Sequence, residues 1–138
     1  MEHLRHFQLS DDPFRNEPLM RSVFEAGPQE DALRRLERSV RQARGLTVLI
    51  GESGSGKTMT VRRLLDRLEE EMFEAGMMVV LHGASDASWM LRRYAVQLGV
   101  EEPATEREGL IAQIYESLAI VREDGRHAIL IIDDADAL

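Results

Sequence analysis

The sequence contains no cysteine in its 138 residues. This absence excludes a disulfide framework and any metal or redox site built on thiolates, and it is compatible with a reducing compartment. No apolar run approaches the length of a membrane span, and the first residues lack the apolar core of a signal peptide. We therefore expect a cytoplasmic location, with any membrane attachment outside these residues, as in the cytoplasmic part of a membrane-anchored protein.

An excess of basic residues is also lacking, because the formal net charge is -8 at pH 7. This charge argues against nucleic-acid binding over a broad basic surface, but it does not exclude a local basic patch. The chain is 43% hydrophobic and 30% charged, a composition typical of one soluble domain that buries about two thirds of its unfolded surface. We expect a single domain over residues 1–138, with a lead-in segment and helix over 1–45 and a core over 46–138.

The most informative segment present reads Gly-Glu-Ser-Gly-Ser-Gly-Lys-Thr at residues 51–58 and fits the GxxxxGK[ST] pattern. It follows the apolar run Leu46 to Ile50 and precedes a helical pattern, which is the strand-loop-helix setting that the motif requires. Its glycines permit backbone conformations in which successive amide N–H groups turn inward around a polyphosphate. Lys57 adds a positive charge, and the helix beginning there points its positive dipole end at the same anion.

This loop predicts a nucleotide site with its own metal ligand. The Thr58 hydroxyl lies where a phosphate-bound Mg²⁺ needs an oxygen ligand. The alternative is a glycine-rich turn followed by an unrelated lysine. The predicted nucleotide-binding residues are Gly51, Glu52, Ser53, Gly54, Ser55, Gly56, Lys57, Thr58 and Met59.

A second candidate segment is the apolar run His127 to Ile132, which meets Asp133 and Asp134. Such a run predicts a buried strand of a parallel sheet, and ligands of open α/β sheets lie at the carboxyl ends of the strands. Asp133 is predicted to hold Mg²⁺, usually through water, and Asp134 to orient or deprotonate the water that attacks the γ-phosphate. Taken alone, the two acids are more typical of a solvated turn. Together with the loop they predict a triphosphate site, in which Lys57 and Asp134 are catalytic and Thr58 and Asp133 are the metal ligands.

Helix and strand signals alternate along the chain, which predicts an α/β fold with a parallel sheet flanked by helices. Asp86 or Ser85 could cap one helix, and Thr105 with Glu108 has the spacing of a capping box for another. The arginine pairs on the helices, Arg62-Arg63 among them, are interpreted as solvated faces. The predicted elements are a helix over 28–44, a strand over 46–50, a helix with apolar positions from 61 towards Gly76 and a strand over 77–81. After them come a helix that ends at Gly99, a second helix that continues to Val121, and a strand over 127–132.

With these motifs in place, the chain resembles the Walker A and Walker B pair of AAA+ P-loop ATPases. The opening Phe7-Gln8-Leu9-Ser10-Asp11-Asp12-Pro13-Phe14, the later Pro18 and Phe24, and the stretch 30–36 are similar to the secretion-pathway A (ExeA-like) family. The resemblance implies ATP and Mg²⁺ as ligands, homo-oligomerisation when full length, and a role with envelope assembly proteins. That family commonly carries Ile-Asp-Glu-Ala where this chain has Ile132-Asp133-Asp134-Ala135, and the shorter acid predicts slower hydrolysis unless the backbone compensates.

The resemblance also implies an incomplete sheet. In AAA+ folds a later strand lies between the loop strand and the strand of the second motif, and it would follow Leu138. We therefore expect an amino-terminal portion of a longer protein, with unpaired backbone groups in the sheet. The alternative is a short form whose strands pair in another order.

Two hypotheses of different classes follow from the motifs. In the first, the chain is an ATPase that energises assembly of a secretion or pilus complex, or a related transposition regulator that acts on DNA. In the second, it is a nucleotide-dependent interaction module with little turnover. Adenine is preferred over guanine only through the family resemblance.

Overall fold

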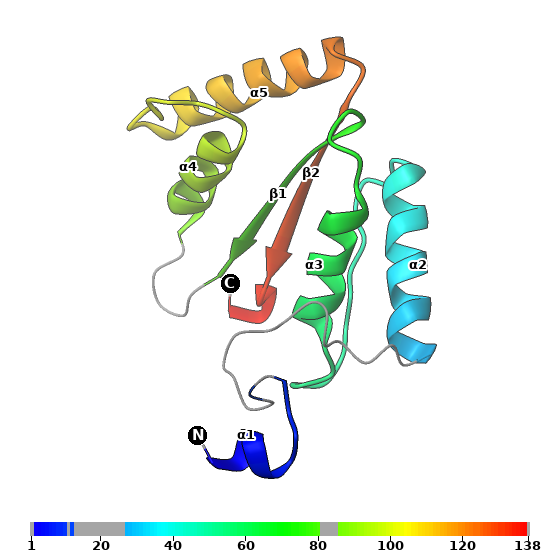
Figure 1. The fold of residues 1–138 in the computed structure, drawn as a ribbon. Coiled ribbons are helices and arrows are strands. Elements are labelled where there is room, and N and C mark those ends of the chain that lie inside the picture. The colour runs from blue at the N-terminus through cyan, green and yellow to red at the C-terminus, as the bar shows by residue number, and fades with distance from the viewer. Residues whose placement is uncertain (1, 11, 13–26, 81–85, 138) are drawn as a thin grey trace.

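The computed structural model describes residues 2–10, 12, 27–80 and 86–137. Two parallel strands, β1 and β2, pair in register from Phe73 opposite His127 to Val79 opposite Asp133. Helices flank this pair, as predicted for an α/β fold (Figure 1). The elements are α1 (Glu2–His6), α2 (Gly27–Arg41), α3 (Lys57–Arg67), β1 (Phe73–Val79), α4 (Ala87–Gln97), α5 (Arg107–Glu123), β2 (His127–Asp133) and η2 (Ala135–Ala137).

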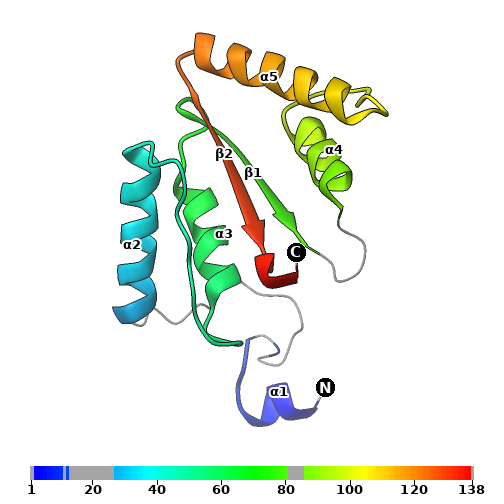
Figure 2. The same ribbon diagram turned by 180° about the vertical axis from the view of Figure 1, so that it is seen from behind.

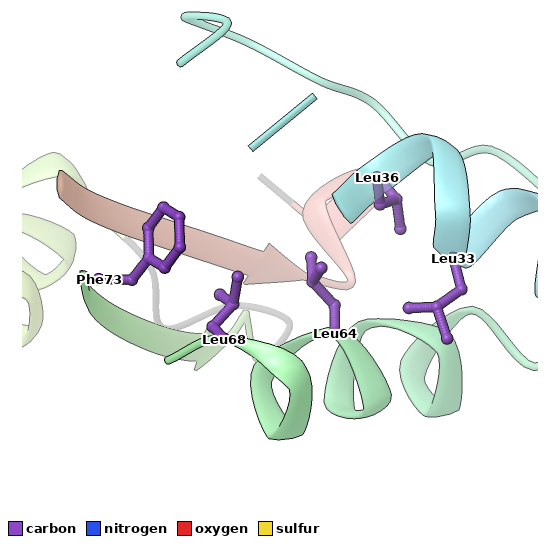
Figure 3. Close-up of a cluster of buried hydrophobic side chains, with 5 residues drawn as sticks. All are labelled: Leu33, Leu36, Leu64, Leu68 and Phe73. Carbon is purple, nitrogen blue, oxygen red and sulfur yellow. The ribbon is translucent and has the colours of Figure 1, made fainter. Parts of the chain in front are cut away.

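The main hydrophobic core lies between α2, α3 and the strands. Figure 3 shows its buried side chains pointing toward one another from α2, α3 and β1. Leu33 of α2 is fully buried, and Ile129 and Ile131 of β2 pack against the cluster. Alternate residues of a strand face opposite sides of the sheet, so Ile129 and Ile131 lie on the same face of β2, and this face packs against α2 and α3. The five buried members are Leu33, Leu36, Leu64, Leu68 and Phe73.

A second, smaller core joins α4 to α5, which lie away from α2 and α3 when the molecule is seen from behind (Figure 2). Ala95 of α4 and Leu110 of α5 are both fully buried in it. The α4 helix begins as predicted, because Asp86 Oδ1 accepts a hydrogen bond from the Trp89 amide at 2.7 Å. The Thr105–Glu108 capping box is wrong, since the residue that precedes α5 is Glu106 and its side chain makes no capping bond.

The predicted strand at residues 46–50 is wrong in the described part of the chain, where this segment joins no sheet. Thr47 binds the Ser39 hydroxyl at 2.8 Å and Leu49 packs against the main core. Leu46, Val48 and Ile50 alternate with them and are 85%, 67% and 87% exposed. The side-chain period of a strand is thus present, but a strand also needs a hydrogen-bonding neighbour, and β1 and β2 pair with each other instead.

The boundary between α3 and β1 also differs from the prediction. The helix was expected to run toward Gly76 and the strand to begin at Met77, whereas α3 ends at Arg67 and β1 begins at Phe73. Leu68 takes an extended conformation and ends the helix. Met72, the last apolar residue of the predicted helical pattern, is 48% exposed, whereas Phe73 and Met78 are buried as residues of β1. Val80 of the predicted strand is buried just after β1. Leu81, His82 and Gly83 lie outside the described residues, as do Pro13, Phe14, Pro18 and Phe24.

Arginine–carboxylate pairs join α2 to α3 and to the turn after it. Arg41 donates to both oxygens of Glu69, at 2.9 and 3.0 Å, and these hydrogen bonds lower the pKa of the Glu69 carboxyl. Arg63 is ion-paired with Glu30 at 3.1 Å and its side chain is only 12% exposed. The interpretation of Arg62-Arg63 as a solvated face is therefore wrong for Arg63.

None of the helices in the described ranges is both long and apolar enough to cross a membrane.

The end of α2 provides the first testable prediction. The helix was expected to reach Arg44, but it stops at Arg41 because Ala43 has φ 49° and Arg44 N donates back to Ser39 O at 3.1 Å. Gly125 occupies the same left-handed position after α5, with φ 75°. A Cβ is unfavourable in this conformation.

Ala43→Gly is therefore expected to raise the free energy of unfolding by about 0.5–1 kcal/mol, since relief of the left-handed penalty exceeds the entropy cost of glycine. The converse change, Gly125→Ala, should lower it by about 1 kcal/mol. Urea unfolding followed by circular dichroism measures both. A loss of stability in Ala43→Gly would contradict the assignment of this helix end.

Candidate functional site

The candidate site lies where β2 ends and α3 begins. Figure 1 shows the arrowheads of both strands at the same end of the molecule as the start of α3. The loop 51–56 enters α3 at Lys57, so it meets the carboxyl ends of parallel strands, which is the place where open α/β sheets bind ligands. The expected juxtaposition of loop and strand end is thus present.

Glycines shape the loop as predicted. Gly54 and Gly56 have φ 77° and 89°, in the left-handed region that a Cβ disfavours. At Gly51 the constraint is space, because an added Cβ would lie 2.7 Å from Ser55 Oγ. A different side chain at any of these positions would therefore change the path of the loop and the direction of its amides.

Lys57 lies over the loop. Its Nζ donates to the carbonyl oxygens of Gly51 at 2.9 Å and Glu52 at 3.0 Å. Ser55 N also donates to Glu52 O, at 3.2 Å, which closes the turn. The ammonium group is thus held beside the amides that would surround a phosphate, where charge-assisted hydrogen bonds to an anion are strongest.

The two sequence motifs meet through Thr58 and Asp133. Thr58 Oγ1 donates to Asp133 Oδ2 at 2.8 Å across 75 positions of sequence. Asp133 is the last residue of β2 and is buried, with 9% of its surface exposed. A buried carboxylate needs a donor or a cation, and the Thr58 hydroxyl is the donor it has in this structure.

This pair fits a magnesium ion. Adjacent oxygen ligands of an octahedral Mg²⁺, with bonds of about 2.0–2.1 Å, lie about 2.9 Å apart, close to the separation of these two oxygens. No group of three or more His, Cys, Asp or Glu side chains that could hold a metal occurs among the described residues. The remaining ligands would therefore be phosphate oxygens and water, which is the usual situation for Mg²⁺.

Asp134 differs from its neighbour in conformation and burial. Its φ is 54°, which is unusual for a residue other than glycine, and its side chain is exposed at the start of η2. Asp and Asn tolerate this left-handed conformation better than other residues because their short polar side chains can hydrogen-bond locally. The backbone therefore turns after β2, and the Asp134 side chain is exposed whereas that of Asp133 is buried.

The other predicted loop residues have less specific surroundings. Glu52 and Ser53 have exposed side chains, and Glu52 acts through its carbonyl rather than its carboxylate. Met59 is half-buried in the first turn of α3. The next residue of α3, Thr60, is buried, and its hydroxyl donates to Gly56 O at 3.0 Å. This contact between α3 and the loop was not predicted from the sequence.

Together, the glycine loop, its lysine, and the threonine–aspartate pair on a parallel α/β sheet define a P-loop NTPase domain. The family model of the AAA domain matches residues 40–138. This stretch spans the loop, both strands and both aspartates, and the chain belongs to the AAA domain family. Comparisons with curated proteins and with solved structures gave no match. The closer resemblance to secretion-pathway A ATPases stays a hypothesis.

Proposed function

We propose that this domain binds ATP with Mg²⁺ and hydrolyses it. The observation that carries the proposal is the hydrogen bond between Thr58 and Asp133, because it joins the phosphate loop to the acidic end of β2 at a spacing that suits a shared magnesium ion. Membership of the AAA domain family supports the same activity. When bound, Mg²⁺ would neutralise phosphate charge.

The residues of the chain have separate roles in this proposal. The loop amides between Gly51 and Lys57 bind and orient the phosphates, and Lys57 contributes positive charge. Asp133 and Thr58 hold the metal. Asp134 accepts a hydrogen bond or a proton from the attacking water, for which its exposed position at the strand end is suitable.

Calorimetric titration of MgATP and a steady-state assay of phosphate release test the proposal together. Binding with a Kd in the micromolar range and turnover that depends on Mg²⁺ are the expected results. Absence of binding for ATP, GTP and ADP alike, with Mg²⁺ present, would reject a nucleotide site. The same titrations with GTP decide between adenine and guanine.

A second candidate, a nucleotide-dependent interaction module, is favoured by one observation. Asp134 is one methylene shorter than glutamate and sits on left-handed backbone, so its carboxylate has a restricted reach. In this case MgATP binding is retained and phosphate release stays at background. The partner would then respond to occupancy of the site rather than to hydrolysis.

The process served rests on the family resemblance alone. We propose assembly of a secretion or pilus complex from the cytoplasmic side, with homo-oligomers formed by the full-length protein and with envelope assembly proteins as partners. The competing proposal is a transposition regulator that acts on DNA. Electron microscopy with ATP and duplex DNA separates the two, because filaments on DNA favour transposition and DNA-independent rings favour an assembly ATPase.

A further inference from the structure

The first turn of α2 contacts the phosphate loop directly. Gln29 Nε2 donates to Ser55 O at 3.4 Å, between residues 26 positions apart. Ser55 lies between Gly54 and Gly56, the two left-handed glycines of the loop. The contact therefore reaches the part of the loop with the least intrinsic conformational restriction.

The geometry of the peptide unit gives this contact a consequence for anion binding. A trans peptide is planar, so the carbonyl of Ser55 and the N–H of Gly56 point in opposite directions. A hydrogen bond from Gln29 to that carbonyl orients the Gly56 N–H away from α2. Gly56 immediately precedes the lysine, where the amides of such a loop surround a phosphate.

Gln29 has a second feature that fold stability does not explain. Its Oε1 atom is buried and has no hydrogen-bond partner among the described residues. A buried acceptor without a partner costs free energy, and a side chain in the first turn of a helix could avoid this cost by turning to solvent. The Gln29 side chain instead lies inward, with its donor group on the loop.

The adjacent residue holds the helix that follows the loop. Glu30 Oε2 accepts from Arg63 at 3.1 Å and Glu30 Oε1 from Arg67 at 3.3 Å. Both arginines belong to α3, which begins with Lys57. One turn of α2 thus contacts the chain on both sides of Lys57, through Gln29 before it and through Glu30 after it.

We propose that Gln29 and Glu30 are positioning residues for the nucleotide site. They hold the Ser55–Gly56 peptide and the start of α3 in the relative arrangement that presents the loop amides and Lys57 to a phosphate. Neither residue touches the nucleotide. The inference rests on the proposed function and adds two residues that lie outside the glycine loop and the strand end.

The test compares Gln29→Met and Glu30→Gln with matched controls. Methionine keeps the length of glutamine without its donor, and Gln42→Met makes the same change at the exposed residue that follows α2. Glu37→Gln is the control for Glu30, because Glu37 also pairs with Arg67 and has a similar exposed fraction, 23% against 25%. Each protein is titrated with MgADP by calorimetry and unfolded in urea.

Gln29→Met and Glu30→Gln are each expected to raise the Kd for MgADP about 5- to 10-fold, the effect of losing one or two hydrogen bonds that orient the site. The two controls should leave the Kd within about twofold. Urea unfolding of Glu30→Gln and Glu37→Gln measures the stability that each variant loses, which separates a change in Kd from a general loss of stability. If MgATP turnover is measurable, KM should rise with little change in kcat.

Equal Kd values for Gln29→Met, Glu30→Gln and the unmodified chain would overturn the inference and leave the proposed function intact. An equal increase for Glu30→Gln and Glu37→Gln would also overturn it for Glu30, because it would indicate a general loosening of the α2–α3 contact. If Glu30→Gln fails to fold, Gln29→Met still decides, since it removes no charge. Failure of the unmodified chain to bind either nucleotide rejects the proposed function itself.

Discussion

Lys57→Ala should reduce the affinity for MgATP by about 100-fold or more and lower turnover to background. The change removes the only lysine of the sequence and with it two hydrogen bonds to the loop carbonyls of Gly51 and Glu52. With a nucleotide bound, the same ammonium group would donate to phosphate oxygens. Charge-assisted hydrogen bonds are worth about 1.5–3 kcal/mol each, and the loss of two such bonds to the phosphates would account for an effect of this size. Calorimetry measures the affinity directly.

The matched control is Arg62→Ala, which removes one positive charge from the exposed face of the same helix. It should leave the Kd within about twofold, because an exposed charge is screened by solvent. Comparable losses in both variants would mean that long-range charge, rather than the position of Lys57 over the loop, governs binding.

A chemical experiment tests the same residue without mutation. Since Lys57 is the single lysine, acetylation of side-chain amines is confined to one site, which mass spectrometry can quantify. MgATP should protect this amine, as its nitrogen would be hydrogen-bonded to phosphate. Labelling at the same rate with and without nucleotide would contradict the proposed contact.

Asp134→Asn should abolish most turnover while leaving MgATP binding nearly unchanged. General acid–base catalysis contributes about 10²–10⁴-fold to a rate, so kcat is expected to fall by at least 100-fold. Asparagine tolerates the left-handed backbone at φ 54°, and the variant should fold normally. Phosphate release under steady-state conditions and calorimetric titration give the two quantities.

Asp136→Asn is the control, because Asp136 is also exposed and lies two residues further along, in η2. It should keep full turnover. Unchanged kcat in Asp134→Asn would exclude Asp134 as the residue that activates water. If the unmodified chain binds MgATP but shows no turnover at all, the interaction-module proposal is supported instead.

The geometry of the candidate site was largely predictable because its residues are close in sequence or carry a strong local pattern. The glycines at 54 and 56 take left-handed conformations, and the strand expected over 127–132 is observed over 127–133. The predicted partnership of Thr58 and Asp133 is a direct hydrogen bond. Backbone steric limits and hydrophobic patterning act locally, and they can therefore be read without a structure.

Some of the errors lie where a partner far along the chain decides. Residues 46–50 have the pattern of a strand, yet no strand pairs with them in the described ranges. Gln29 and Arg63 gave no local signal of their contacts with Ser55 and Glu30, because these partners are brought together only when α2 packs on α3.

The amino-acid order by itself determined the class of the domain and the candidate residues for its nucleotide site, since glycine, lysine, hydroxyl and carboxylate chemistry at fixed spacings has few other uses. Tertiary structure alone decided which strands pair, how α2 contacts the loop, and that Asp133 is buried while Asp134 is exposed. Hydrogen-bond pairing between strands and contacts between helices depend on which surfaces meet in space, and local residue pattern does not specify that choice.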